Sequence, residues 1–314
     1  MIQTVTGKIE GSEIGCVLMH EHISCSSVAC VNAFSGRWLD KERLKTLSVE
    51  TLSLAKQKYG LGLIVDGTPI DLGRDGAILK EISELSGVRM VASTGFYYLQ
   101  SIETKSNSPE ELAHWLIEEF ENGIAGTDIK PGILKCATGE HGITLDNLTK
   151  LSAVGIAQSV TGLPLYVHCE HRGDIAFKQI EALIKSGAEI KKIIIGHTAM
   201  RPGIEYLESI LKTGCYISMD QCHCYPGRID EIAKALVFLC SKGYSDKILI
   251  SNDHCIHSDF ARRDKNGLHL SATQHADGLG YVFDHLKSKY MEFGGQSNDW
   301  NAITSKNPIE VLDI

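Results

Sequence analysis

CVLMHEHISC, residues 16–25, places two histidines, His20 and His22, one residue apart directly after a short apolar run. In a β-strand the side chains of residues i and i+2 point to the same face. A strand ending in this segment would therefore direct both imidazoles to one place, where they could share a metal ion. The fold then depends on whether similar strands recur along the chain.

Short apolar runs of this kind recur along the whole sequence, and each is followed by polar or glycine-containing residues and then by a stretch with helical features. The eight runs are CVLMH (16–20), LGLIVDGT (61–68), RMVASTGF (89–96), GILKCAT (132–138), LPLYVHC (163–169), KKIIIGH (191–197), GCYISMD (214–220) and DKILISND (246–253). Runs that are apolar on both faces and linked by helices indicate parallel strands buried on both sides. Eight such units predict an α/β fold, a (β/α)8 TIM barrel that forms one domain over residues 1–314.

The segments between these runs carry helix signals. In the stretch 108–123, Ser108 is expected to cap a helix, Pro109 suits its first position, and Glu111 completes a capping box. The segment from about 255 to 298 is the exception, because it is long and rich in His, Arg, Asp and Gly. We expect it to form an extended final loop and a helix.

Length and composition limit the function classes. The 314 residues fit one barrel, which commonly takes about 250. A net charge of -8 without a basic stripe argues against nucleic-acid or membrane-surface partners. The N-terminus lacks the features of a signal peptide, and no apolar run approaches the roughly 18 residues of a membrane span. These features predict a cytoplasmic protein.

The ten cysteines are scattered, and several lie within apolar runs, where free thiols pack as small hydrophobic side chains. We expect them to be reduced. The group Cys222-His223-Cys224 is a weak zinc candidate, because structural zinc sites need four ligands, usually in two separated pairs.

Polar residues at the predicted strand ends form the candidate site, because the C-terminal ends of barrel strands converge on the face where chemistry takes place. Six potential ligands meet there: His20, His22, Lys135, His168, His197 and Asp253. Each alone has an ordinary structural explanation, such as a helix cap for the aspartate. Together, imidazoles and a carboxylate suit zinc first, and also manganese, cobalt or nickel. Four histidines and an aspartate exceed the needs of one ion with an open position, so we expect two divalent ions.

Lys135 poses a separate problem, since an ammonium group has no lone pair and would repel cations. A buried, neutral amine that reacts with carbon dioxide would give a carbamate, N6-carboxylysine, whose two oxygens could bridge both ions. The sequence alone leaves this modification as a hypothesis.

Motifs along the chain support a family resemblance: MHEHI (19–23), DLGRD (71–75), Lys135, VH (167–168), IGH (195–197), SND (251–253) and NP (307–308). With these motifs the chain resembles the phosphotriesterase family of the amidohydrolase superfamily, and within it the phosphotriesterase-like lactonases and phosphotriesterase-related proteins. The resemblance implies a hydrolase and suggests a homodimer.

The resemblance also implies a role for each candidate ligand. His20, His22 and Asp253 match ligands of a more buried metal, whereas His168 and His197 match those of a more exposed one. Lys135 matches a carboxylated lysine that bridges both metals together with a hydroxide. Asp253 would accept the proton of that hydroxide and pass it towards His197 or the leaving group. Two divalent ions opposed by carbamate, carboxylate and hydroxide would leave about one net positive charge to attract the substrate oxygen.

The substrate is the least determined part of the prediction. Tyr97 aligns with an aromatic residue that lines the site in the lactonase branch. That branch has an Asp-Arg pair after strand seven, where this chain has Asp220-Gln221, which argues against acyl-homoserine lactones. Three loop arginines are candidates to bind a phosphate or carboxylate of the substrate: Arg228, Arg262 and Arg263.

These features favour a lactonase acting on a small lactone, with an anionic or phosphorylated sugar lactone as the preferred substrate. Two other enzyme activities stay open, the hydrolysis of small N-acyl amides and of phosphotriesters. A non-catalytic binding protein is the remaining alternative, and the complete ligand set argues against it.

Overall fold

The central sheet positions the candidate site. The computed structural model describes residues 1–259 and 278–314. Within them, nine strands form one sheet in the order β10-β9-β8-β7-β6-β5-β4-β3-β11, and every neighbouring pair is parallel. The strands are β3 (Cys16–Cys25), β4 (Leu61–Asp66), β5 (Arg89–Gly95), β6 (Ile133–Thr138), β7 (Leu165–Cys169), β8 (Ile193–Ile195), β9 (Tyr216–Met219), β10 (Ile248–Ile250) and β11 (Cys255–Ser258). Seven of the eight predicted runs each contain one of the strands β4–β10, and the first run forms the beginning of β3, which continues to Cys25.

The sheet closes where the chain beyond β10 meets β3. The backbone N–H of Asp253 donates to the carbonyl of His20 at 2.9 Å, and the N–H of His22 donates to the carbonyl of His254 at 2.8 Å. The N–H of His20 also donates to the Ser251 hydroxyl at 2.7 Å. These bonds join the first and last barrel strands, and the predicted TIM barrel is confirmed.

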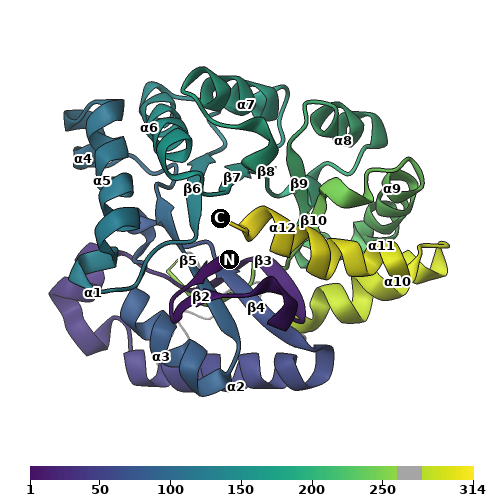
Figure 1. Cartoon of the computed structure of the whole chain (residues 1–314), viewed down its shortest axis with the longest axis horizontal. Coiled ribbons are helices and arrows are strands. Elements are labelled where there is room, and N and C mark those ends of the chain that lie inside the picture. The colour runs from purple at the N-terminus through teal and green to yellow at the C-terminus, as the bar shows by residue number, and fades with distance from the viewer. Residues whose placement is uncertain (260–277) are drawn as a thin grey trace.

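Helices form an outer ring around the barrel, and the C-terminal helix lies across one barrel end (Figure 1). They are α1 (Val28–Phe34), α2 (Lys41–Tyr59), α3 (Gly76–Ser86), α4 (Ile102–Ser106), α5 (Pro109–Asn122), α6 (Leu145–Thr161), α7 (Ile175–Lys185), α8 (Ile204–Leu211), α9 (Ile229–Ser241), α10 (Lys287–Glu292), α11 (Ser297–Asn301) and α12 (Asn307–Leu312). The predicted capping box begins α5, where Ser108 and Glu111 bond each other's backbone N–H. In the described ranges, none of these helices is both long and apolar enough to cross a membrane.

Two apolar layers hold the barrel together. The outer layer lies between strands and helices, and the inner layer fills the barrel interior with one or two side chains from each of the strands β3–β10. The inner residues are Val17, Met19, Leu63, Val65, Val91, Ile133, Tyr166, Ile194, Tyr216 and Leu249. Ile2, Val311 and Leu312 extend this layer at the end where both termini lie (Figure 1). That end is therefore closed by apolar packing, which leaves the opposite end for polar side chains.

Two elements differ from the sequence prediction. The hairpin of β1 (Ile2–Thr4) and β2 (Gly7–Ile9) was not expected, and it covers the closed end. The predicted loop beginning at Cys255 starts instead with the strand β11, in which Cys255 pairs with His22. β3 is ten residues long and extends past the end of β4, so its free edge binds the chain that leaves the site. The helix expected before residue 298 is confirmed as a π-helical turn (Val282–Leu286) followed by α10.

Candidate metal centre

An irregularity in β3 aims His20 and His22 at the barrel interior. Leu18 pairs with Ile64 and Glu21 with Asp66, so β3 contains one residue more than β4 between these pairs. Such a bulge shifts the alternation of side chains by one position. Val17 and Met19 face the interior below the bulge, and the shift keeps both histidines on that side above it.

A glycine on the neighbouring strand end makes room for His20. A Cβ atom added at Gly67 would lie 2.4 Å from Cδ2 of His20 and 2.7 Å from its Nε2. Any other residue at this position would displace the ring, because real Cβ atoms do not approach other heavy atoms so closely.

Three strand ends hold a strained backbone at the site. His197, Gln221 and Asp253 follow β8, β9 and β10, and their φ angles are 59°, 58° and 57°. These values lie in the left-handed region, which non-glycine residues seldom adopt and which costs on the order of 1–3 kcal/mol each. Among the described non-glycine residues only Ala125 shares a positive φ. The strain is concentrated where the candidate ligands turn into the barrel mouth.

Lys135 and His20 meet at the centre of the barrel mouth. The Lys135 Nζ lies 2.5 Å from Nε2 of His20, and both side chains are 1% exposed. Burial lowers the pKa of Lys135 below its ordinary value. Burial, followed by the nearby Lys135, lowers the pKa of His20 to about 3. Both groups are thereby biased towards neutral forms that carry a lone pair.

His168 and His197 form a second close pair. Nδ1 of His168 lies 2.6 Å from Nε2 of His197, and the two rings are nearly perpendicular, with centroids 4.2 Å apart. Burial, followed by the positive charge that His197 would carry, holds the pKa of His168 well below its usual range. Two imidazole nitrogens at this distance cannot both carry a hydrogen on the line that joins them, so at least one of them presents a lone pair that could bind an ion.

Asp253 connects the two groups. Its Oδ1 lies 3.1 Å from Nε2 of His22 and 3.6 Å from Nε2 of His20. Its Oδ2 lies 3.8 Å from Nδ1 of His197 and accepts a hydrogen bond of 2.7 Å from the Gln221 amide. Burial would raise the pKa of Asp253, but the nearby histidines hold it well below its usual range. The structure thus brings all six predicted ligand positions together.

Asp220 is the main site residue that the sequence reasoning missed. Its carboxylate accepts from Nδ1 of His20 at 3.0 Å, from Nδ1 of His197 at 2.9 Å, and from the His197 backbone N–H at 2.7 Å. The Tyr166 hydroxyl donates to the same carboxylate. Burial would raise the pKa of Asp220, but the two histidines lower it far below its usual range. One buried anion therefore orients a ligand from each candidate metal position. The run GCYISMD ends in this residue, so the strand-end rule that selected Asp253 would also have found it.

A second buried carboxylate, Glu21, fixes the segment that carries Asp253. Its Oε1 accepts from the Ser251 hydroxyl at 2.7 Å and from the Asn252 N–H at 2.8 Å, and its Oε2 accepts from the His254 N–H at 2.7 Å. Asp253 lies between these donors, so its strained backbone is held on both sides.

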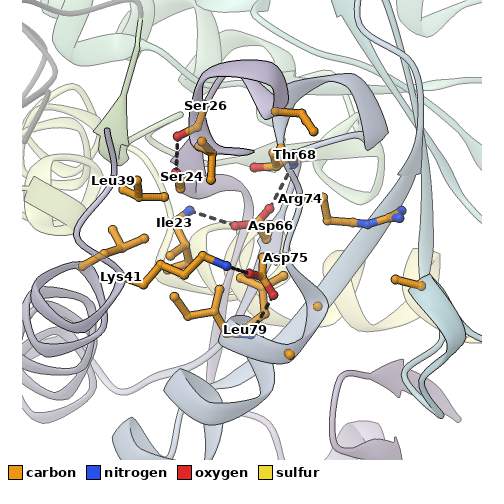
Figure 2. Close-up of a pocket in the computed structure, with 18 of the residues that line it drawn as sticks. Ile23, Ser24, Ser26, Leu39, Lys41, Asp66, Thr68, Arg74, Asp75 and Leu79 are labelled. Carbon is orange, nitrogen blue, oxygen red and sulfur yellow. Dashed lines mark hydrogen bonds and ion pairs between the residues drawn. The ribbon is translucent and has the colours of Figure 1, made fainter. Parts of the chain in front are cut away.

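Thr68 and Asp66 hold the side of His22 that points away from Asp253. The Thr68 hydroxyl lies 2.8 Å from Nδ1 of His22, and Asp66 accepts from the N–H groups of Thr68 and Ile23. Figure 2 shows these Asp66 bonds at the edge of a cavity of about 280 Å³. The cavity is lined by residues of β3, β4 and the nearby helices and contains none of the six candidate ligands.

The candidate substrate residues have different surroundings. The Tyr97 ring meets His168 edge-on, with centroids 5.3 Å apart. Asp71 accepts from the Tyr97 N–H at 2.8 Å, and the buried Lys150 donates to the Tyr97 carbonyl at 2.9 Å. The backbone of this aromatic residue is thus fixed beside the site by two side chains, which sequence reasoning had not assigned to it.

The candidate arginines are not brought to the site by the described residues. The Arg228 guanidinium pairs with Glu231 at 2.9 Å and donates to the Met200 carbonyl at 2.9 Å. Arg262 and Arg263 lie outside the described residues.

The donor chemistry fits a metal centre. Two groups of three residues, His20–His22–Asp253 and His20–His197–Asp220, each offer ligand atoms within 4.8 Å of one another. Imidazole nitrogens and carboxylate oxygens on a rigid frame suit zinc and similar divalent ions. A closed parallel barrel with such a cluster at the C-terminal ends of its strands defines an enzyme of the TIM-barrel class with a candidate metal site.

Comparison with known proteins identifies the family. The model of the Phosphotriesterase family matches residues 1–292, and the chain belongs to this family. An aryldialkylphosphatase of Saccharolobus solfataricus is 31% identical over 257 residues, which cover 80% of this chain and 81% of the relative. An N-acetyltaurine hydrolase of Rattus norvegicus is 30% identical and covers 99% of this chain and 97% of its own length. The phosphotriesterase structure from Mycobacterium tuberculosis superposes with a TM-score of 0.89 at 23% identity, covering 99% of this chain and 98% of that one. The protein is therefore a hydrolase of the phosphotriesterase family, as the resemblance predicted.

Proposed function

We propose that this protein is a binuclear metal-dependent hydrolase that opens a small lactone by adding water to its ester carbonyl. The observation that supports the proposal best is the position of Asp220, whose carboxylate holds Nδ1 of both His20 and His197. Their Nε2 atoms then face Lys135 and His168, respectively. A buried anion that orients two histidines towards further donors is typical of a metal centre.

The ligands divide into two sets in this proposal. His20, His22 and Asp253 would hold the inner ion, and His168 and His197 would hold the outer one. Lys135 lies against His20 and is buried, so its amine would react with carbon dioxide to give the bridging carbamate, N6-carboxylysine. Zinc is the first candidate, with manganese, cobalt and nickel as alternatives. When bound, such ions supply water with a pKa lowered towards about 7 and polarise the carbonyl oxygen.

Asp253 would accept the proton in this reaction. Its Oδ1 is directed at His20 and His22, which leaves Oδ2 as the basic oxygen. The Gln221 amide holds Oδ2 at 2.7 Å, and Nδ1 of His197 lies 3.8 Å away. Gln221 would therefore set the orientation of the carboxylate, and the proton would pass from Oδ2 towards His197 or the leaving group. This assigns a positioning role to the residue that replaces the arginine of the lactonase branch.

Tyr97 would form one wall of the substrate site. Its edge contact with His168 places an aromatic surface beside the outer set of ligands. Asp71 and Lys150 fix its backbone, so this wall is preorganised for a flat, compact ring such as a lactone. An anionic group on the lactone would depend on Arg262 and Arg263, because Arg228 already has an ion-pair partner in Glu231.

Hydrolysis of a small N-acyl amide is the second candidate. Its support is the similarity to the N-acetyltaurine hydrolase of Rattus norvegicus, which extends over 99% of this chain. The same donors and the same proton acceptor would serve an amide carbonyl, so the ligand cluster does not separate the two substrates.

A substrate panel run on the metal-loaded protein tests the proposal. It should contain neutral and anionic lactones, N-acyl amino acids, N-acyl aminosulfonates and phosphotriesters, with each kcat/KM measured under identical conditions. We expect the highest value for a lactone. Faster turnover of an N-acyl compound would replace the lactone by the second candidate, and faster turnover of a triester would refute attack at a carbonyl.

The variant Lys135→Ala tests whether the lysine takes part in the reaction. The variant should lose activity against every compound in the panel, and short carboxylic acids should restore part of it by occupying the place of the carbamate. Full activity without such an addition would remove Lys135 from the mechanism.

A further inference from the structure

Two cysteines lie against the metal centre and have no role in the proposed reaction. Cys25 ends β3 and Cys255 begins β11, and their Sγ atoms are 3.8 Å apart. The two sulfur atoms and one ring nitrogen of His22 all lie within 4.8 Å of one another. Cys25 is 3% exposed and His22 is 7% exposed, so this group is built into the wall of the barrel.

The spacing of the two sulfur atoms matches that of a metal thiolate site. A tetrahedral zinc ion with Zn–S distances of about 2.3 Å places two thiolates about 3.8 Å apart. The Sγ–Sγ distance of 3.8 Å therefore already equals the edge of such a tetrahedron. With a histidine as third ligand, the donor set contains two sulfurs and one nitrogen, which favours soft d10 cations over magnesium or calcium.

A cation also has a route to this group. Cys25 lines a cavity of about 630 Å³ beside the barrel mouth, and the carboxylate residues Asp71 and Asp259 line the same cavity. Their negative charge favours entry of a cation. Cys255 is partly exposed, so the pair is not sealed inside the protein.

We propose that Cys25, Cys255 and His22 form a third, thiolate-containing site for a soft divalent cation such as Zn²⁺ or Cd²⁺. On binding, each thiol loses its proton to solvent and forms a metal–sulfur bond. No oxidant or reductant is needed, because only protons are exchanged for the cation.

The third site shares His22 with the proposed reaction centre. Nδ1 of His22 lies 2.8 Å from the Thr68 hydroxyl and Nε2 lies 3.1 Å from Asp253, so both nitrogens are already engaged. A cation at the two thiolates takes His22 from one of these partners. Excess soft metal therefore inhibits the enzyme. This inhibition rests on the proposed function, whereas the binding of metal by the two thiolates is independent of it.

Cadmium titration of the metal-loaded protein tests the site directly. We expect one additional Cd²⁺ per chain, with the ultraviolet sulfur-to-cadmium charge-transfer band of two thiolates. Cys25→Ser and Cys255→Ser should each abolish this additional binding. Cys30→Ser is the matched control, because Cys30 is partly exposed and lies outside the group. Retention of the band in Cys25→Ser or in Cys255→Ser, or its loss in Cys30→Ser, would overturn the proposal.

Cadmium NMR of the unmodified protein gives an answer even where a variant does not fold. A resonance in the range of two sulfur ligands supports the site, and the absence of any sulfur-ligated resonance at saturating Cd²⁺ refutes it. Activity is then measured in parallel. Binding of the additional Cd²⁺ should inhibit the unmodified protein. Cys255→Ser, which lacks this binding, should keep its activity at the same Cd²⁺ concentration. Equal inhibition of the unmodified protein and of Cys255→Ser would refute the claim that the third site and the reaction centre share His22. The spectra decide separately whether the third site exists.

Discussion

The strand ends and the loops above them differ in how far their chemistry is determined by the fold. At the strand ends, six candidate ligands from five strands meet around Asp220, and their atoms lie within a few ångströms of one another. In the loops, Tyr97 reaches the site, but Arg228 binds Glu231 instead. A parallel barrel directs its strand ends to one place, whereas loop side chains choose among many local partners. Catalytic chemistry is therefore easier to infer here than substrate recognition.

The two regions also differ in the contacts that hold their side chains in place. The strand-end ligands rest on buried carboxylates: Asp220 holds two histidines, and Glu21 holds the backbone around Asp253. Arg228 rests on an exposed ion pair, which is worth roughly 0–1 kcal/mol. Substitutions at the strand ends should consequently have large effects, and substitutions in the loops should have small ones.

The largest effect is expected at Asp253. Asp253→Asn keeps the shape of the side chain but removes its basicity, and general-base catalysis contributes about 10²–10⁴-fold. We expect kcat to fall by that order while the circular dichroism spectrum and melting temperature stay close to those of the parent. Asp174→Asn, at the exposed start of α7, should keep full activity. A kcat close to that of the parent in Asp253→Asn would assign this residue a structural role only.

A buried histidine in the segment that follows β7, His171, should control acid stability. Nε2 of His171 donates to the Gly196 carbonyl at 2.7 Å, and its Nδ1 accepts from the Tyr206 hydroxyl at 2.7 Å. Burial lowers the pKa of His171 to about 4, whereas the unfolded residue takes up a proton near pH 6.5. The unfolded state therefore binds more protons between these values, so stability is lost as the pH falls through this window. The loss from this residue should approach about 3 kcal/mol at pH 4.

Chemical unfolding between pH 7 and pH 4 measures this contribution. His171→Gln should show a shallower pH dependence of the free energy of unfolding than the parent. His141 is 85% exposed in a loop, so His141→Gln should follow the parent curve. Identical slopes in parent and His171→Gln would contradict the assignment.

Asp220→Asn should have the next largest effect. The amide keeps the volume but cannot accept from both histidine rings as a charged carboxylate does. Loss of such a supporting group costs about 10–100-fold in metal affinity or activity. Equilibrium dialysis against a metal buffer should show weaker binding, and saturating metal should restore part of kcat. Unchanged metal affinity would show that Asp220 does not orient the ligands.

The smallest effect is expected at Arg228. Because its guanidinium is paired with Glu231, Arg228→Gln should change kcat/KM for an anionic lactone by less than about threefold, the scale of one exposed ion pair. The comparison of anionic and neutral lactones with this variant isolates any contact with the substrate charge. A selective loss of tenfold or more for the anionic lactone would mean that Arg228 leaves Glu231 to bind substrate.

The same contrast explains what the sequence could predict. Residues such as His168 end an apolar run, and a parallel strand fixes where its last side chain points, so the barrel and the ligand positions follow from the pattern of runs. β11 has the sequence CIHS, which contains no apolar run of the kind that marked the other strands, and it forms because the long β3 offers a free edge. The contacts of the Tyr97 backbone could not be predicted from the sequence either. Asp71 and Lys150 are 79 positions apart in the chain, and only the fold brings them to the same residue.

The ion content of the active protein tests the central proposal most directly. Protein purified without chelators should be analysed for metal by mass spectrometry while kcat is measured on the same sample. The proposal predicts that activity rises with metal content to two divalent ions per chain, and that the intact mass of this form includes one added carbon dioxide, which is absent from Lys135→Ala. Full activity with one ion or none per chain would contradict it.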